Sequence, residues 1–256
     1  MEYIARLFGL VMMSWVVVSC AQPPAPDMVV PSKMTRQLVT ERVSAVVVTN
    51  RADIQSWMHG NFSVKRAPKD ADGGSAAPIS PDGYFLTADH VLSRLQDRNV
   101  FLIFGQGHKR LQTMKARVVW RSESSDLALL HVDLKTPYYY RWSSPEKWLP
   151  AGTFVIHGGI STGFKNAVGK LGTSLSPESP MTGTRSFKMD IPLQPGDSGG
   201  PIVNAYGELV GINSAVEFLV PMETAFFVDS EGNRPNTRSI EEIIAEDRSR
   251  RQAATP

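Results

Sequence analysis

Short apolar runs separated by turn residues recur along most of the chain. Many of the runs are rich in β-branched and aromatic side chains, and glycine, proline, asparagine or aspartate often lies between them. This pattern predicts an all-β protein. Gly105, Gln106 and Gly107 lie between two such runs and are typical of a hairpin tip. We expect strands at Ala45–Thr49, Tyr84–Leu86, Asn99–Phe104, Lys115–Trp120, Leu127–Val132, Thr153–His157, Ala167–Thr173, Ser186–Ile191, Pro201–Val203, Glu208–Ser214 and Ala225–Val228.

The last part of the chain has a helical pattern. Ser239 and Glu242 have the spacing of a capping box, and Ile240, Ile243 and Ile244 fall on one helical face. We therefore expect a short helix that packs through its isoleucines. Three basic residues lie near the end of this helix: Arg248, Arg250 and Arg251. We interpret them either as a solvated terminus that suits the helix dipole or as a binding patch.

Near the start of the chain, after the weakly charged segment Glu2–Arg6, lies an apolar run, Leu7–Val18. At twelve residues it is too short to span a bilayer but suits a signal-peptide core. The segment Val17–Cys20 resembles a bacterial lipobox, which implies that Cys20 becomes the lipid-modified first residue. The alternative is an ordinary buried cysteine in an uncleaved anchor. Ala21–Pro26 is typical of a flexible or polyproline tether. The absence of aspartate after Cys20 favours outer-membrane sorting, by resemblance to Gram-negative lipoproteins.

Composition limits the functions that remain open. The chain has 256 residues, of which 42% are hydrophobic, so it can bury a sizeable core. Its net charge is +2 and no basic run lies beside aromatic residues, so we expect no nucleic-acid partner. With Cys20 as the only cysteine, no intramolecular disulfide can form. The histidines lack metal-ligand spacing, and we expect neither a metal site nor a cofactor.

Three segments carry candidate chemistry. Ser198 lies within Gly196–Pro201, where the flanking glycines permit a strained turn and a close approach of substrate. A serine hydroxyl needs a neighbouring base, and that base needs an orienting group. His90 follows an apolar stretch, and Asp126 precedes another. The order His, Asp, Ser is one of the known orders of a catalytic triad.

At these segments the chain resembles the trypsin-like serine proteases, and most closely their bacterial HtrA (Deg) branch. The resemblance covers Val43–Ser230 and lies in Ser80–Gly83, Thr87–Val91, Asp126–Leu130, Gln194–Pro201 and Gly207–Ala215. It implies two six-stranded antiparallel β-barrels with the active site between them. We therefore expect a signal peptide at 1–19, a tether at 20–40, an N-terminal barrel at 41–135, a crossing at 136–150, a C-terminal barrel at 151–230 and a helical tail at 231–256. The residues after Ser230 are too few for the PDZ domain of many HtrA proteins.

The resemblance also implies a role for each site residue. His90 would be the general base and Asp126 would orient its ring, and the alternative for His90 is a structural histidine. The backbone N–H groups of Gly196 and Ser198 would form the oxyanion hole. Pro192 takes the place of the pocket floor, where an aspartate would select lysine or arginine. We expect a preference for small or medium apolar side chains, with the pocket wall formed by Ser214, Ala215 and Val216.

Two aspartates depart from the HtrA pattern. Asp197 matches trypsin, in whose zymogens this residue pairs with an amine that activation cleavage releases. A mature N-terminus at Cys20 would be acylated, so we expect Asp197 to pair with an internal group or solvent. Asp89 precedes His90 and is either a bystander or an influence on the acidity of His90.

These observations predict a serine endopeptidase that acts on unfolded or extended proteins of the cell envelope. Its partners would be polypeptide substrates and, through a lipid on Cys20, a membrane. Many HtrA relatives are trimers, so the resemblance also allows a homo-oligomer. The alternative is a catalytically inactive protease-like domain that binds an envelope protein or peptide. An esterase would use the same triad but would need an open acyl pocket.

Overall fold

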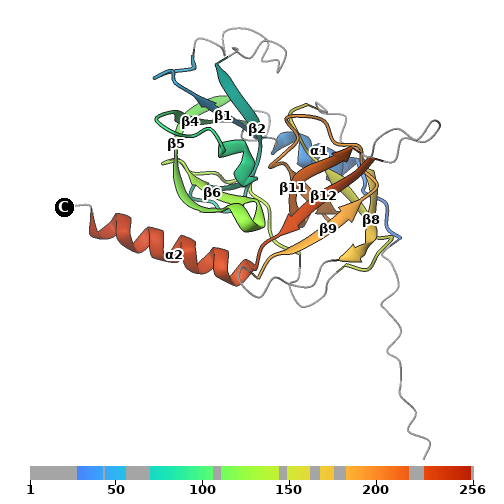
Figure 1. The fold of residues 1–256 in the computed structure, drawn as a ribbon. Helices are drawn as coiled ribbons and strands as arrows, with labels where there is room; N and C mark the ends of the chain where they lie inside the picture. The colour runs from blue at the N-terminus through green and yellow to red at the C-terminus, as the bar shows by residue number, and fades with distance from the viewer. Residues whose placement is uncertain are drawn as a thin grey trace, which may run out of the picture.

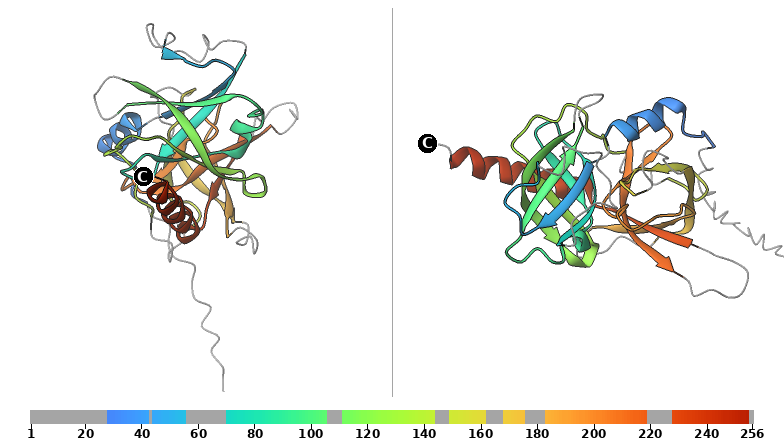
Figure 2. Two further views of the ribbon diagram at one scale, coloured as in Figure 1. Left: turned by 90° about the vertical axis from the view of Figure 1, so that its left-hand side faces the viewer. Right: turned by 90° about the horizontal axis from the view of Figure 1, so that it is seen from above.

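The strands form two closed six-stranded barrels, which lie side by side (Figures 1 and 2). The computed structural model describes residues 28–42, 44–55, 70–105, 111–143, 149–161, 168–175, 183–218 and 228–254. All strand pairs within the barrels are antiparallel. This architecture confirms the expected all-β fold with two six-stranded antiparallel barrels.

The N-terminal barrel has the strand order β1-β2-β3-β6-β5-β4. Alternate residues of a strand point to opposite faces, so Val46 and Val48 of β1 line the barrel core while Ala45 and Val47 pack outside it against Ile54. Every residue of β1 is therefore buried. The strands are β1 (Ser44–Thr49), β2 (Ala71–Pro78), β3 (Tyr84–Thr87), β4 (Asn99–Phe104), β5 (Gln112–Ser122) and β6 (Leu127–His131).

Strand β2 was absent from the sequence-based expectation because its residues lack bulky apolar side chains. The structure explains this composition through close backbone contacts. A Cβ atom on Gly73 would lie 2.9 Å from the carbonyl oxygen of Val46, and one on Gly74 would lie 2.8 Å from that of Ser198. The glycines thus allow β2 to run against β1 and against the turn of the candidate nucleophile.

The C-terminal barrel has the order β10-β11-β12-β9-β8-β7. Its core includes Phe187, which packs against the glycines of two neighbouring strands, Gly211 and Gly232. Of the predicted strand Ala225–Val228, residues 225–227 lie outside the described residues, and Val228 is the first residue of β12. The strands are β7 (Phe154–His157), β8 (Val168–Leu175), β9 (Arg185–Met189), β10 (Pro201–Asn204), β11 (Leu209–Phe218) and β12 (Val228–Arg234).

A helix, α1 (Lys33–Glu41), occupies the end of the segment 20–40 that we expected to be a tether. The Ser32 side chain caps it by accepting a hydrogen bond from the Thr35 N–H. Thr35 donates its hydroxyl to the Ala205 carbonyl at 2.7 Å, and Val39 is fully buried against the C-terminal barrel. The tether prediction is therefore wrong for these residues, because they cover apolar surface of the barrel.

The C-terminal helix α2 (Thr237–Ala253) confirms the predicted helix but begins earlier. Its N-cap is Asn236, not Ser239, whose N–H donates to the Asn236 side chain. The helix leaves the C-terminal barrel and runs along the N-terminal barrel (Figure 1). Arg248 forms a bidentate ion pair with Asp82 of that barrel, at 2.7 Å for both contacts. Neither interpretation of the basic end therefore fits Arg248, which fastens the helix to the barrel.

Apolar side chains from both barrels and α2 meet in one buried cluster between them. This cluster fixes the relative position of the two halves that carry the candidate triad. It includes Tyr84, Leu86, Leu127, Leu129, Tyr140, Ile156, Val203, Leu209, Ile212, Ile240 and Ile244.

No helix among the described residues is long and apolar enough to cross a membrane. The expected signal peptide and Cys20 lie outside the described residues, as do Gln106 and Gly107 of the expected hairpin tip. Within the described part of the chain, no group of three histidine, cysteine, aspartate or glutamate residues could hold a metal ion.

Candidate active site

His90 and Asp126 lie on short turns at the ends of adjacent strands of the N-terminal barrel. His90 lies in the 3-10 turn Asp89–Leu92, which follows β3, and Asp126 directly precedes β6. Strands β3 and β6 are paired, so the two side chains are brought to the same edge of the barrel. Asp126 has a φ of +47°, in the left-handed region that aspartate tolerates better than most residues.

The His90 ring is held by the Asp126 carboxylate. Its Nδ1 lies 2.9 Å from Oδ2 and 3.0 Å from Oδ1 of Asp126, and the backbone N–H of His90 donates to Oδ1 at 2.9 Å. The hydrogen bond with Asp126 raises the pKa of His90 above its usual value, against the opposing effect of burial. This geometry favours a proton on Nδ1 and leaves Nε2 free to accept one.

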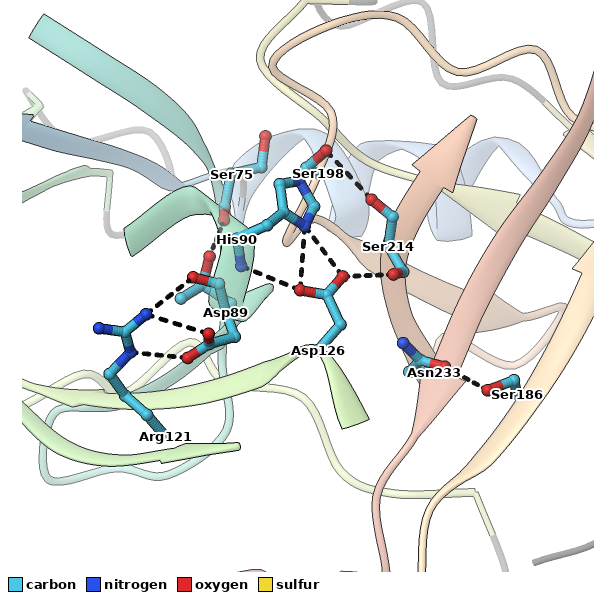
Figure 3. Close-up of polar contacts among 10 residues, drawn as sticks. Ser75, Asp89, His90, Arg121, Asp126, Ser186, Ser198, Ser214 and Asn233 are labelled. Atoms are coloured by element: carbon cyan, nitrogen blue, oxygen red, sulfur yellow. Dashed lines mark hydrogen bonds and ion pairs between the residues drawn. The ribbon is translucent and has the colours of Figure 1, made fainter. Parts of the chain in front are cut away.

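Ser214 of β11 links the two barrels at this point (Figure 3). Its hydroxyl donates to Oδ2 of Asp126, and its carbonyl accepts a 3.2 Å hydrogen bond from the hydroxyl of Ser198. Burial by itself would raise the pKa of Asp126, but the hydrogen bonds from His90 and Ser214 outweigh it and lower this pKa. The aspartate is thus stabilised as the anion that can balance a protonated His90.

Ser198 lies in a tight turn of the C-terminal half, next to the His90 ring (Figure 3). The turn needs glycine, because Gly199 has a φ of +86° and a Cβ atom there would lie 2.1 Å from the carbonyl oxygen of Ser75. The N–H of Ser75 donates to the Ser198 carbonyl at 2.7 Å. No hydrogen bond joins the Ser198 hydroxyl to His90 among the described residues, because the hydroxyl is turned to Ser214.

The backbone N–H groups of Gly196 and Ser198, the predicted oxyanion hole, have no acceptor among the described residues. Asp197 lies between them and is fully buried. Its carboxylate accepts from the N–H groups of Ser161 at 3.1 Å and Gln194 at 2.9 Å. The prediction of an internal group as the partner of Asp197 is confirmed by these two contacts.

Asp89 points away from His90. Its carboxylate forms a bidentate ion pair with Arg121 of β5, at 2.7 Å to Nε and 3.0 Å to an Nη atom. The charge of Asp89 still adds slightly to the raised pKa of His90. The pair joins the turn that carries His90 to β5, a contact that sequence reasoning missed because the partners are 32 residues apart.

The residues of the predicted substrate pocket lie on two elements of the C-terminal half. Pro192 is exposed on the loop after β9. Ser214, Ala215 and Val216 lie on β11, at a register shift in its pairing with β12. Ser214 contacts two members of the candidate triad directly, Asp126 and Ser198, which the prediction of a pocket wall did not include. The sequence patterns did not identify Ser75 and Ser161, whose hydroxyls donate to the carbonyls of Gly196 and Pro195, just before Ser198. The only sequence signal for such a close approach was the pair of glycines before Ser75.

Comparison with known proteins identifies the family. The model of the trypsin-like peptidase domain family matches residues 74–212. A probable periplasmic serine endoprotease DegP-like protein of Pseudomonas fluorescens is 32% identical over 180 residues, which cover 62% of this chain and 34% of the relative. A protein of the same description from Pseudomonas fulva is 28% identical over an alignment of 271 positions, which covers 89% of this chain and 53% of the relative. The chain thus spans about a third to a half of the length of these curated relatives.

Solved structures agree on the fold. The HtrA-type protease AlgW with a tripeptide matches with a TM-score of 0.57 at 21% identity, covering 82% of this chain and 62% of that chain. Deg5 matches with a TM-score of 0.57 at 16% identity, covering 81% of this chain and 90% of that chain. At such low sequence identity, these matches show only that the fold is shared. The match to the family model over more than half of the chain shows that the chain belongs to the trypsin-like peptidase domain family.

Proposed function

We propose that the chain is a serine endopeptidase with His90, Asp126 and Ser198 as its catalytic triad. The observation that carries the proposal is the hydrogen bonding of His90 Nδ1 to both oxygens of Asp126, beside a serine in a glycine turn. An imidazole held in this way can accept a proton on Nε2. The family match supports the same reaction class.

The reaction begins when the Ser198 hydroxyl leaves the Ser214 carbonyl and turns toward Nε2 of His90. Its oxygen attacks the substrate carbonyl carbon as His90 takes the hydroxyl proton. The N–H groups of Gly196 and Ser198 stabilise the oxyanion of the tetrahedral intermediate. The intermediate collapses to an acyl-enzyme as His90 gives the proton to the leaving amine. Water then attacks the acyl-enzyme by the same route in reverse and releases the acid.

The proposed substrates are unfolded or extended polypeptides that pair with the backbone of β11 near Ala215 and Val216. Pro192 offers no charge for a basic side chain, so we propose cleavage after small or medium apolar residues. A peptide-library digest tests this preference. Equal or faster cleavage after lysine would contradict it.

We also propose a lipid anchor on Cys20 in the cell envelope, at the outer membrane. The relatives, described as probable periplasmic serine endoproteases, support an envelope location. Mass spectrometry of the mature N-terminus tests the anchor, with a Cys20→Ser variant as control. An unmodified Cys20 within an intact leader would overturn this part of the proposal.

Degradation of an unfolded protein such as casein tests the endopeptidase. We expect wild-type protein to degrade it and Ser198→Ala to leave it intact. Stoichiometric binding of casein by both proteins, without cleavage, would instead support the alternative of an inactive peptide-binding domain. The hydrogen bond from Ser198 to Ser214 is the observation that favours this alternative, since it leaves Ser198 unbonded to His90.

A further inference from the structure

Two serine hydroxyls hold the peptide groups on either side of Gly196. Ser161 donates its hydroxyl to the carbonyl of Pro195, and Ser75 donates its hydroxyl to the carbonyl of Gly196 at 2.7 Å. Pro195 and Gly196 thus both have their carbonyl oxygens fixed by side chains from outside the loop. Ser75 belongs to β2 of the N-terminal barrel, whereas Ser161 belongs to the segment that follows β7 of the C-terminal barrel.

The contact of Ser161 sets the direction of the Gly196 N–H. The N–H of Gly196 and the carbonyl of Pro195 belong to one trans peptide group, in which the two bonds point in opposite directions. Because the Pro195 carbonyl points to Ser161, the Gly196 N–H points away from it. A rotation of this peptide by half a turn would break the hydrogen bond with Ser161 and turn a carbonyl toward the oxyanion.

Other contacts keep Ser161 in place. Its backbone N–H donates to the buried carboxylate of Asp197, and the N–H of the preceding Ile160 donates to the Ser75 hydroxyl at 3.0 Å. A Cβ atom on Gly159 would lie 2.2 Å from Oδ1 of Asp197, so glycine is needed for this approach. The segment 159–161, the loop 195–197 and β2 therefore form one connected network.

We propose that Ser161 and Ser75 are positioning residues that hold the Gly196 N–H in the orientation required of an oxyanion-hole donor. Ser161 fixes the peptide that carries this N–H, and Ser75 fixes the next peptide and ties it to the other barrel. The inference rests on the proposed endopeptidase function. Two hydroxyl groups of the chain itself thus hold the loop 195–197 in the conformation that the oxyanion hole requires.

Fluorophosphonate labelling of the purified protein tests the proposal, since the rate of attack by Ser198 depends on the oxyanion hole. For Ser161→Ala and for Ser75→Ala we expect the maximal labelling rate to fall about tenfold, the effect of losing one hydrogen bond. The reagent concentration at half-maximal rate should stay the same. Ser161→Thr, which keeps the hydroxyl, should remain within about twofold of wild type.

Ser249→Ala is the matched control, because the Ser249 hydroxyl also donates to a backbone carbonyl but lies on the exposed face of α2. It should label like wild type. Modification of His90 by diethyl pyrocarbonate, together with the thermal midpoint, separates positioning from general loss of structure. Ser161→Ala should leave the His90 modification rate unchanged, since the His90 side chain is 48% exposed and does not contact Ser161.

The outcomes distinguish the two proposals. Absence of labelling in wild-type protein would refute the endopeptidase function itself. Labelling of wild type with unchanged rates in both alanine variants would overturn only the positioning role. A parallel fall in labelling, His90 modification and thermal midpoint would assign the serines a purely structural role, which also contradicts the inference.

Discussion

His90 and the carboxylate of Asp126 are joined by three hydrogen-bond contacts of 2.9 to 3.0 Å, two from the imidazole Nδ1 and one from the backbone N–H of His90. The backbone contact ties the turn that carries the proposed base to its orienting carboxylate. The pair is therefore positioned within one barrel. Only the proposed nucleophile, Ser198, comes from the other barrel.

The raised pKa of His90 predicts a pH dependence of activity. Neutral His90 is the form that accepts a proton, so activity should rise with pH, with a midpoint above about 6.5. In Asp126→Asn the midpoint should shift to lower pH, and the rate at neutral pH should fall by about 10⁴. Labelling rates between pH 5 and 9, a range of about two units on each side of neutrality, measure both effects. An unchanged midpoint in the variant would contradict the assignment.

Ser214→Ala should slow labelling about tenfold or more, because a hydrogen bond to a charged group contributes about 1.5 to 3 kcal/mol. The variant removes the donor to Asp126 but keeps the backbone carbonyl that accepts from Ser198. Ser186→Ala is the control. This serine lies on β9 of the same barrel, and its hydroxyl donates to Asn233 (Figure 3). Equal rates in the two variants would show that Ser214 has no special effect on Asp126.

His157 predicts a pH dependence of stability. It is fully buried with its Nδ1 at 3.2 Å from the Asn213 amide, and burial lowers its pKa below the usual value even though Asp197 opposes this. Below about pH 6.5 the unfolded chain binds a proton at this histidine that the folded chain does not bind. The free energy of unfolding should therefore fall as the pH is lowered through this range. His157→Gln should reduce this loss by up to about 1.4 kcal/mol per pH unit.

Denaturant unfolding of the wild type and of His157→Gln at several pH values measures the difference in slope. The comparison uses slopes because the substitution also changes the free energy of unfolding at neutral pH. Parallel pH profiles for the two proteins would contradict the prediction.

Asp247→Ala should lower the free energy of unfolding by about 1 to 3 kcal/mol, because it leaves former partners of a buried carboxylate without an acceptor. Asp247 accepts from both Nη atoms of Arg117 and from the Tyr84 hydroxyl, and so joins α2 to the N-terminal barrel. Glu246→Ala is the control. Glu246 pairs with Arg250 on the exposed face of the helix, so its removal should cost less than about 0.5 kcal/mol. Equal losses in the two variants would indicate that α2 is not fastened through Asp247.

Local patterns predicted most of the strands because their apolar runs are continuous, as in Leu127–Val132 and Asn99–Phe104. They could not predict β2 or α1, whose positions depend on what they contact. Strand β2 is formed by close pairing with other backbone segments, and α1 by the fit of Val39 against the C-terminal barrel. Patterns measured within a short window contain no information on such partners.

The same limit applies to the site. Motifs around His90 and Ser198 identified the candidate triad, because their residue types and order are specific. The patterns did not identify the two serine hydroxyls that contact the loop before Ser198. The contact from Ser161 to Pro195 joins residues 34 positions apart, and the contact from Ser75 to Gly196 joins residues 121 positions apart. Serine is common in loops, so neither residue stands out before the fold brings it to the loop.

In the proposed mechanism, His90 activates Ser198 for attack on a carbonyl. The most direct test of this step is labelling with a fluorophosphonate at neutral pH, followed by mass spectrometry to locate the adduct. We expect one adduct per chain on Ser198 in wild-type protein and none in His90→Ala over the same time. An adduct on another residue, or equal labelling of Ser198 in His90→Ala, would contradict it.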